Sequence, residues 1–441
     1  MKALGAGDYE LILKVTDKDG EEMLISGDKL SGLVYREGVQ CPTIECDFAL
    51  VDTNDANYME KILVGEKVSL TFRTKESADV TVKLVIYSIM AGGRENDKVA
   101  NIFRCMSDEA FRSLYTRIEK LYKETTPTEI ITDILTTFVG SSKEVSTGIE
   151  AEPLTVAAMR DKPFDFIQSV CKRSIPSETS QKGAGKGTAG FTFYETSTGF
   201  HFKSMDELLG AESDGGAYAP TTSKIKGEKE VETYYVNVAP NADGTSDEDE
   251  TRVVQNYSIK DNNDLEDQLY RGTQANLVGF FDPNSLRYTE EIYVLKGENF
   301  DAMGHLAKGT GENPNIDTWR ETPSRVMTKV FNNEMYELKS ERAEEEKYDK
   351  IKQYLAQQLV RNNLGKNQKV EINIPGNSTL HAGDKIILQV YKSVSNADSS
   401  KKDRVDKKMS GYYLISKVAH KFDSGMATTT CLLIRDQNNE T

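Results

Sequence analysis

The sequence predicts an α+β protein, mainly β, in which two similar antiparallel β-barrels carry helical and α+β insertions. Apolar and polar side chains alternate towards both ends of the chain, which is typical of half-buried strands. Between these regions the apolar spacing changes to that of amphipathic helices. Glycine and aspartate separate the expected strands, so antiparallel hairpins fit the pattern better than β-α-β units.

The first expected barrel covers residues 1–104. Three segments in it, 9–15, 68–72 and 80–86, have apolar side chains at every second position. This period of two indicates strands with one buried face. Short stretches rich in glycine and aspartate, such as 17–20, separate the strands and favour hairpins.

An insert containing helices is expected at residues 105–222. Asp108 and Glu109 suit the first turn of a helix, because the positive end of the helix dipole attracts carboxylates. Apolar residues then recur at helical spacing as far as Leu121. The pattern predicts one amphipathic helix over this stretch.

Two further helices and a hairpin are expected in the same insert. Thr126–Glu129 is a capping box with proline at the first helical position, and Gly140 suits the end of that helix. Pro163 is expected to start the third helix. Aromatic and polar residues alternate over 191–202 on both sides of a short turn, which predicts a hairpin.

The second expected barrel combines residues 223–300 with residues 366–441. Alternating strand patterns resume at Val253 and again in the last part of the chain. Residues 301–365 are expected to form a second insert, made of an extended arm and an amphipathic helix that Gly365 ends.

Two segments, 212–230 and 241–250, are poor in large apolar side chains. Burial of apolar surface is what offsets the entropy cost of ordering a chain. We therefore expect both segments to be mobile before assembly and to be cut first in limited proteolysis.

Composition limits the possible functions. The chain has 441 residues, of which 38% are hydrophobic and 28% charged, which suffices for two or three cores. Its formal net charge of -15 argues against a nucleic-acid reader, because such proteins replace counterions with Lys and Arg. The acidity either aids solubility or provides a repelling field, and both interpretations stay open. No segment approaches the about 18 apolar residues that cross a bilayer, so stable membrane insertion is not expected.

Residues that often carry chemistry are few and scattered. The five cysteines form no CxxC pair, so reduced, buried thiols are expected rather than disulfides or a zinc site: Cys41, Cys46, Cys105, Cys171 and Cys431. The four histidines show no metal-binding spacing and are interpreted as structural: His201, His305, His381 and His420.

Two other features are interpreted without a functional role. Residues 185–190 match GxGxxG formally, but they precede a strand, whereas a dinucleotide site places its glycines between a strand and a helix. Trp319 is interpreted as a packing anchor rather than a carbohydrate contact. The two carboxylates of a glycosidase could lie anywhere among 70 acidic residues. We predict no catalytic, cofactor-binding or metal-binding residue, expect no cofactor and no enzymatic activity, and leave the oligomer interface open.

Three motifs resemble a known family. Residues 102–110, followed by the helix at Thr126–Pro127, are similar to the strand-to-helix passage after the first barrel of phage baseplate hub proteins. Lys162–Ile167 resembles the third helix of that family. Gly383–Ile386 and Gly411–Phe422 are similar to its closing strands.

The resemblance implies a structural hub of a contractile tail. In this family three chains, each with two tube-like barrels, form a ring that joins a hexameric tail tube to a trimeric spike and forms part of the DNA channel. No repeats follow the last expected strand, so the spike is expected to be a separate protein. The implied partners are a second and third copy, the tube, the spike and baseplate wedge proteins, with genome DNA passing through unbound. The implied location is the virion, after assembly in the host cytoplasm.

Two alternatives stay open, a tail-associated cell-wall hydrolase and the hub portion of a type VI-like secretion spike. The charge of a trimer, -45 (3 × -15), would repel DNA phosphates if part of it faced the channel. The acidic residues would otherwise cover only the outside of the ring.

Overall fold

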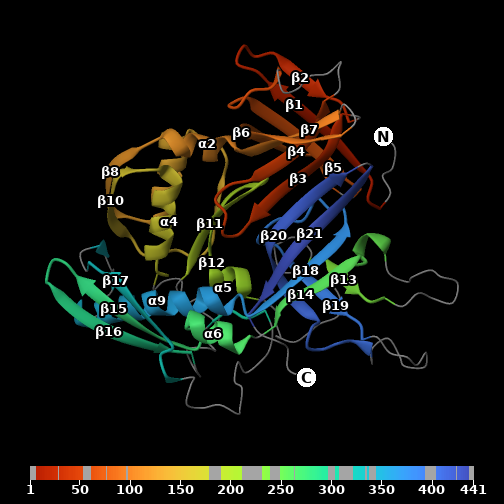
Figure 1. Cartoon of the computed structure of the whole chain (residues 1–441). Coiled ribbons are helices and arrows are strands. Elements are labelled where there is room, and N and C mark those ends of the chain that lie inside the picture. Colours follow the sequence, from red (N-terminus) through yellow and green to blue (C-terminus); the bar gives the residue numbers. More distant parts are fainter. Residues whose placement is uncertain are drawn as a thin grey trace.

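The computed structural model describes residues 6–27, 29–52, 61–75, 77–95, 98–177, 190–210, 231–238, 249–262, 264–295, 303–306, 321–332, 335–336, 344–392, 404–423 and 425–436. The fold is mainly β, as expected, and the helices α2 to α6 and α9 lie in two inserts (Figure 1). Within these ranges no helix combines the length and the apolar character that crossing a membrane requires.

Thirteen of the described strands form one sheet (Figure 1). The first half of the sheet contains β1 Tyr9–Thr16, β2 Glu22–Ile25, β3 Leu30–Gly38, β4 Glu45–Asp52, β5 Lys67–Thr74, β6 Val80–Glu95 and β7 Lys98–Ser107. The second half contains β13 Thr233–Val236, β14 Asn256–Asn262, β18 Gln368–Pro375, β19 Lys385–Val390, β20 Gly411–Asp423 and β21 Met426–Arg435. The main strand order is β14-β18-β21-β20-β3-β4-β7-β6-β5-β1-β2, with β19 paired to β20 and to β13.

Strands β3 and β20 join the two halves. Gly32–Gly38 pair in antiparallel register with Lys417–Asp423. Each half has its own hydrophobic core on one face of the sheet, because the apolar side chains of its strands alternate with polar ones. Phe422 of β20 belongs to the core of the first half, so the two cores meet at this pairing.

The expectation of two closed barrels is wrong for the described strands. Their order is open, because it starts at β14 and ends at β2 without a pairing between these two edges. Strand β3 pairs with β20 of the other half instead of closing the first half on itself. A common strand order in the two halves stays a prediction.

The first insert is an α+β unit. Its helices are α2 Asp108–Tyr115, α3 Pro127–Asp133, which continues into a π-helical segment at Ile134–Val139, α4 Pro163–Arg173 and α5 Met205–Leu209. Its strands are β8 Ile118–Thr125 with β10 Leu154–Asp161, and β9 Val145–Thr147 with β11 Phe191–Thr196 and β12 Gly199–Ser204. The capping box at Thr126 and Glu129, the left-handed Gly140, the helix start at Pro163 and the hairpin of β11 and β12 are confirmed.

One helix of this insert is shorter than predicted. Helix α2 ends at Tyr115, because Thr116 has an extended backbone and caps the carbonyl of Arg112 with its hydroxyl at 2.9 Å. Ile118 and Leu121, which continued the helical spacing, lie in β8. Ile118 is buried and Leu121 is 63% exposed. Pairing with β10, a tertiary contact, overrides the local pattern.

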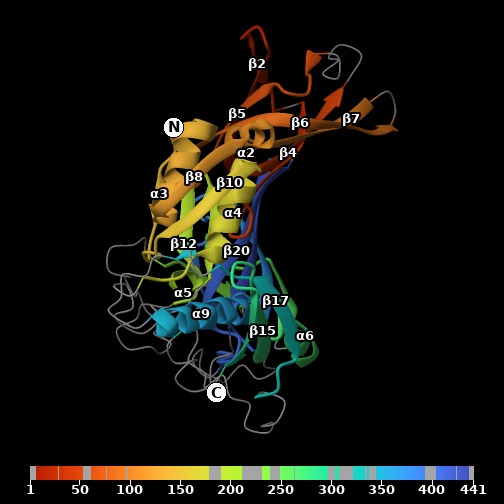
Figure 2. The same ribbon diagram turned by 90° about the vertical axis from the view of Figure 1, so that its left-hand side faces the viewer.

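In the structure, the second insert is larger than the expected 301–365, because it comprises a three-stranded sheet, a short helix before the sheet and a long helix (Figures 1 and 2). Its sheet has the order β16 Arg287–Val294, β15 Ala275–Asp282, β17 Arg325–Val330. Helix α6 Leu265–Arg271 precedes the sheet, and α9 Glu344–Leu364 packs on β15 and β16. Gly365 follows the last residue of α9, as expected. Both inserts contribute side chains to one core, so they pack against each other.

The placement of β15 and β16 corrects the expected composition of the second β-unit. Residues 275–294 are not hydrogen-bonded to the large sheet, although β13 and β14 from the same stretch are. They pair with β17 and pack on α9, so they belong with residues of the expected second insert. Strand patterning identified these strands but contained no signal for their partner.

Several predicted features lie outside the described residues. These are the segment 212–230, most of 241–250, most of the expected arm after residue 300, Trp319 and residues 185–189 of the glycine-rich stretch.

Removal of the Phe422 ring tests the coupling of the two halves. Its ring is 1% exposed and lies 5.1 Å from the ring of Tyr9 and 5.2 Å from that of Phe72. Phe422→Ala should lower the free energy of unfolding in urea by about 3–5 kcal/mol, because the cavity cannot close in a packed core. The exposed neighbour provides the control, since Lys421→Ala should change stability by less than about 0.5 kcal/mol. Equal stability of the two variants would contradict the packing role of Phe422.

Candidate functional site

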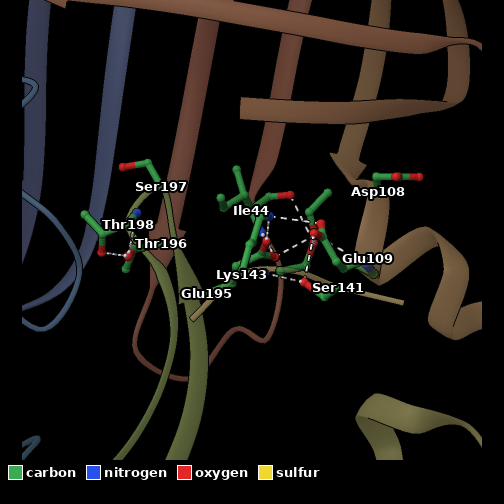
Figure 3. Close-up of polar contacts among 12 residues, drawn as sticks. Ile44, Asp108, Glu109, Ser141, Lys143, Glu195, Thr196, Ser197 and Thr198 are labelled. Carbon is green, nitrogen blue, oxygen red and sulfur yellow. Dashed lines mark hydrogen bonds and ion pairs between the residues drawn. The ribbon is translucent and has the colours of Figure 1, made fainter. Parts of the chain in front are cut away.

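A cluster of two buried carboxylates and a half-buried lysine connects the first insert to the large sheet (Figure 3). The Lys143 ammonium lies 2.5 Å from Oε1 of Glu195 on β11 and 2.9 Å from Oε2 of Glu109 on α2. Ser107, at the end of β7, donates a hydrogen bond of 2.6 Å to Glu195. The backbone N–H of Ile44 donates another to the same carboxylate at 3.2 Å. We call this group the Lys143 cluster.

Contacts within the Lys143 cluster oppose the effect of burial on the charges of Lys143 and Glu195. Burial by itself lowers the pKa of a lysine, but Glu195 and Glu109 outweigh this effect and raise the pKa of Lys143. Burial also raises the pKa of Glu195, against the charge of Lys143 and the hydrogen bond from Ser107. Ser141 satisfies the second oxygen of Glu109 at 3.2 Å. Glu195 therefore has partners from three separate segments, whereas both partners of Glu109 come from the loop between the π-helical segment and β9.

A second cluster is centred on Glu37 of β3, whose side chain is buried. The Tyr35 hydroxyl donates to Oε1 of Glu37 at 2.6 Å, and the Ser197 N–H donates to the same oxygen at 2.9 Å. The Ala382 N–H donates to Oε2 at 3.1 Å, and Nδ1 of His381 lies 3.4 Å away. The Glu37 cluster thus joins β3, the turn of the β11–β12 hairpin and the loop before β19.

The donors around Glu37 stabilise its charged form. Burial favours the protonated acid, but hydrogen bonds and charge from His381, together with the Tyr35 hydroxyl and the Ser197 amide, lower the pKa of Glu37. Burial and the adjacent Glu37 charge raise the pKa of Tyr35. The tyrosine therefore remains a hydrogen-bond donor.

Ser197, His381 and Glu37 superficially resemble a nucleophile, a base and an orienting acid. The Ser197 hydroxyl lies 3.5 Å from Nδ1 of His381, and Glu37 contacts the same nitrogen. A catalytic triad instead uses the two different ring nitrogens for the nucleophile and the acid. The observed geometry orients His381 against Glu37 and leaves no route for proton transfer from Ser197 through the ring. The arrangement therefore favours a structural role.

A cavity of about 400 Å³ adjoins the Glu37 cluster and is lined by His201, His381 and Asp384, among others. Several of its polar groups already have protein partners. Asp384 accepts from the N–H of His381 at 2.9 Å, and His201 lies 2.8 Å from the Thr196 hydroxyl. Nowhere in the described ranges do three or more His, Cys, Asp or Glu side chains converge on a metal position.

The other two histidines that were predicted to be structural, His305 and His420, also have side-chain partners. His305 lies 2.5 Å from Asp436. His420 is buried, stacks on Tyr35 and lies between the Thr429 hydroxyl and the Leu380 carbonyl. Burial lowers the pKa of both His201 and His420 to about 4, so both rings are neutral near pH 7.

The cysteines are free thiols, and four of the five are buried, as expected; Cys41 is half-buried. Cys46 and Cys105 lie opposite each other on β4 and β7. Burial raises the pKa of both thiols, so neither is activated as a nucleophile.

Sequence reasoning missed the acids at the centres of both clusters. Glu37 follows Leu33 and Tyr35 at every second position, and Glu195 follows Phe191 and Phe193 in the same way. Their parity places both acids on the buried face of a strand. An acid on the apolar side of an alternating strand was therefore the available signal.

No family model and no curated protein matches this chain, but solved structures share its fold. The tail protein of Neisseria meningitidis MC58 has a TM-score of 0.56 at 10% identity, covering 97% of this chain and 97% of that chain. The 43 kDa tail protein of prophage MuSo2 from Shewanella oneidensis has a TM-score of 0.54 at 11% identity, covering 97% and 98%. A type VI secretion component of E. coli has a TM-score of 0.40 at 10% identity, covering 94% and 76%.

At these identities the likeness to the two tail proteins establishes a shared fold over nearly the whole chain, and the third, weaker likeness adds nothing to it. Both inserts lie within the matched length. The expected resemblance to tail proteins is thus confirmed at the level of the fold.

The Lys143 cluster predicts a large effect from one substitution. Lys143→Met should lower the free energy of unfolding by about 3–5 kcal/mol, because it leaves two buried carboxylates without a cation. Lys120→Met is the control, since its pair with Asp133 is partly exposed and should contribute about 0–1 kcal/mol. Urea unfolding of the two variants measures the difference. Similar losses in both would show that the buried pair contributes no more than a surface pair.

The buried His420 predicts a pH dependence. The Leu380 carbonyl can only accept, so Nε2 of the neutral ring donates to it and Nδ1 accepts from the Thr429 hydroxyl. Burial disfavours a second proton on this ring. Because the pKa is lowered in the folded state to about 4, the unfolded chain binds a proton first as the pH falls. The contribution of His420 to the free energy of unfolding is therefore fully present at neutral pH. It is lost as the pH falls from about 6.5 towards 4, by up to about 3 kcal/mol.

His420→Gln should flatten this dependence. The free energy of unfolding of the variant, measured between pH 7 and pH 4, should fall less than that of the unchanged chain. His201 keeps its own lowered pKa, so part of the pH dependence of the unfolding free energy should remain in the variant. Parallel pH profiles for the two proteins would refute a role of His420 in the acid sensitivity.

Proposed function

We propose that this chain is a structural protein of a phage tail and forms the central hub of its baseplate. The observation that carries the proposal is the likeness to two tail proteins across 97% of the chain, inserts included. A shared fold alone does not establish a function, so the site must agree with it. The buried charges described above are all used in joining parts of the chain, which suits a structural role.

Rigidity is what a hub requires, since it must hold several partners in fixed positions. The Lys143 cluster and the Glu37 cluster connect the first insert to the large sheet through side chains with several partners each. Satisfied buried networks of this kind favour one relative placement of the connected parts. We infer a non-enzymatic role from this arrangement.

In finer terms, we propose a ring of three copies between a hexameric tail tube and a separate trimeric spike. Each chain carries two β-units in one sheet, so three chains present six units, which matches the symmetry of a hexameric tube. The further partners would be baseplate wedge proteins. The site of action would be the virion, after assembly in the host cytoplasm.

The face of the large sheet opposite its cores is the proposed wall of the DNA channel. Ion pairs lie on this face, such as Arg36 at 2.8 Å from Asp47 and Lys14 at 2.9 Å from Glu22. Paired charges give a weak field beyond about 8 Å at physiological salt. DNA should therefore pass without tight, salt-sensitive binding.

The stoichiometry tests this proposal. Native mass spectrometry of the purified chain should give three times 49.2 kDa. Tails purified from producing cells should contain three copies of the chain per tail. A stable monomer in both preparations, or a band of peptidoglycan clearing by the isolated chain in a zymogram, would contradict the hub and favour the cell-wall hydrolase.

A further inference from the structure

The sheet of the second insert has one apolar face that no described part of the chain covers. Two rows of cross-strand neighbours form it, one at each end of the strands. In each row the central residue comes from β15 and its neighbours from β16 and β17. The rows are Tyr288, Phe281, Val330 and Ile292, Leu277, Val326. We call this surface the β15 face.

Exposure distinguishes the β15 face from the opposite side of the same sheet. Val326 is 68% exposed and Val330 is 75% exposed. On the other side, Val278 and Phe280 are fully buried in a core to which α9 contributes. Helix α9 lies beside β15 (Figure 2). Apolar residues on both faces of a strand are typical of a sheet covered on both sides. The β15 face therefore has the composition of an interior surface while facing solvent.

The row between the two apolar rows contains Glu290, Gly279 and Thr328. A Cβ atom at Gly279 would come within 2.2 Å of the Tyr288 hydroxyl, so the glycine provides the space in which the Tyr288 ring lies across the sheet. The hydroxyl donates to the Glu290 carboxylate at 3.1 Å. In the described ranges, no Lys or Arg pairs with Glu290.

The charge of Glu290 restricts what can cover this surface. A purely apolar cover would bury the carboxylate with one hydrogen bond and no counter-charge, which is strongly unfavourable. A second copy stacked face to face would bring two Glu290 carboxylates together. An anionic membrane or a nucleic acid would meet a negative charge at the centre of the patch. A protein segment with apolar side chains and one cation meets none of these penalties.

We propose that the β15 face docks an apolar segment of another tail protein, which places a Lys or Arg against Glu290. This inference rests on the proposed function, because the tail supplies the partner. The face is about 10 Å wide between its outer strands and about 14 Å long between its two rows, by the usual strand spacings. These dimensions suit a single helix or a pair of strands.

Thiol labelling in the assembled tail tests the coverage. Val330→Cys is introduced into the full chain, and N-ethylmaleimide labelling at that position is read by peptide mass spectrometry. The new thiol should react freely in the isolated chain and at least tenfold more slowly in purified tails. Denatured tails provide the control that the thiol is intact.

Charge reversal tests the chemistry of the partner. Glu290→Lys should reduce incorporation of the chain into tails at least fivefold, and Glu290→Gln should reduce it less. Glu266→Lys is the matched control, because Glu266 is an exposed acid on the neighbouring α6 outside the β15 face, and it should be incorporated normally. Unchanged thermal unfolding of the isolated variants excludes misfolding as the cause.

The outcomes separate this inference from the hub proposal. If tails contain the chain but position 330 labels as fast as in the isolated chain, docking at the β15 face is refuted and the hub proposal stands. Protection in the isolated chain would identify a second copy as the occupant and overturn the inference. Normal incorporation of Glu290→Lys would refute the proposed contact between Glu290 and a Lys or Arg of the partner. Absence of the chain from tails would refute the proposed function itself.

Discussion

Pairing between β3 and β20 brings strands from opposite parts of the chain into one sheet, and the positions of the other parts depend on it. The pairing sets Phe422 in the core of the first half and places β3 beside the second half. Glu37 lies on β3 near the end of this pairing, where the first insert and the loop before β19 approach. A slip of one residue would turn Glu37 to the opposite face and expose the core side chains.

Buried ion pairs are weak sources of net stability, because removal of charges from water costs nearly as much as their attraction returns. In this chain their distribution indicates another role. The Lys143 cluster and the Glu37 cluster both lie at boundaries between parts rather than inside one part. A third pair, Asp206 and Arg361 at 2.7 Å, connects the end of the first insert to α9, and both of its side chains are fully buried. Each cluster is satisfied only when the parts adopt one arrangement, which favours a rigid structure.

The surface of the molecule complements this rigid interior. The sheet presents paired charges on the face opposite its cores, whereas the second insert presents apolar rows around a single acid. In the proposed hub, the first surface would face a passing polyanion without binding it, and the second would bind another protein. A central component of a tail needs both properties.

Local physical rules acted strongly enough for several elements to be determined by the sequence alone. The capping box at Thr126, the helix start at Pro163 and the alternation of strands such as β5 and β11 depend on neighbouring residues, and all were confirmed. The mainly β fold class followed from the same local patterns.

The tertiary structure decided which strands pair and what the buried acids contact. Alternation places a side chain on a face but is the same for every partner strand, so the open sheet, the separate place of β15 and β16, and the strand at Ile118 and Leu121 were not predicted. Glu37 and Glu195 had the parity of buried residues, yet their partners lie far away in the sequence. Hydrogen bonds between distant segments depend on the completed packing, and no local spacing encodes them.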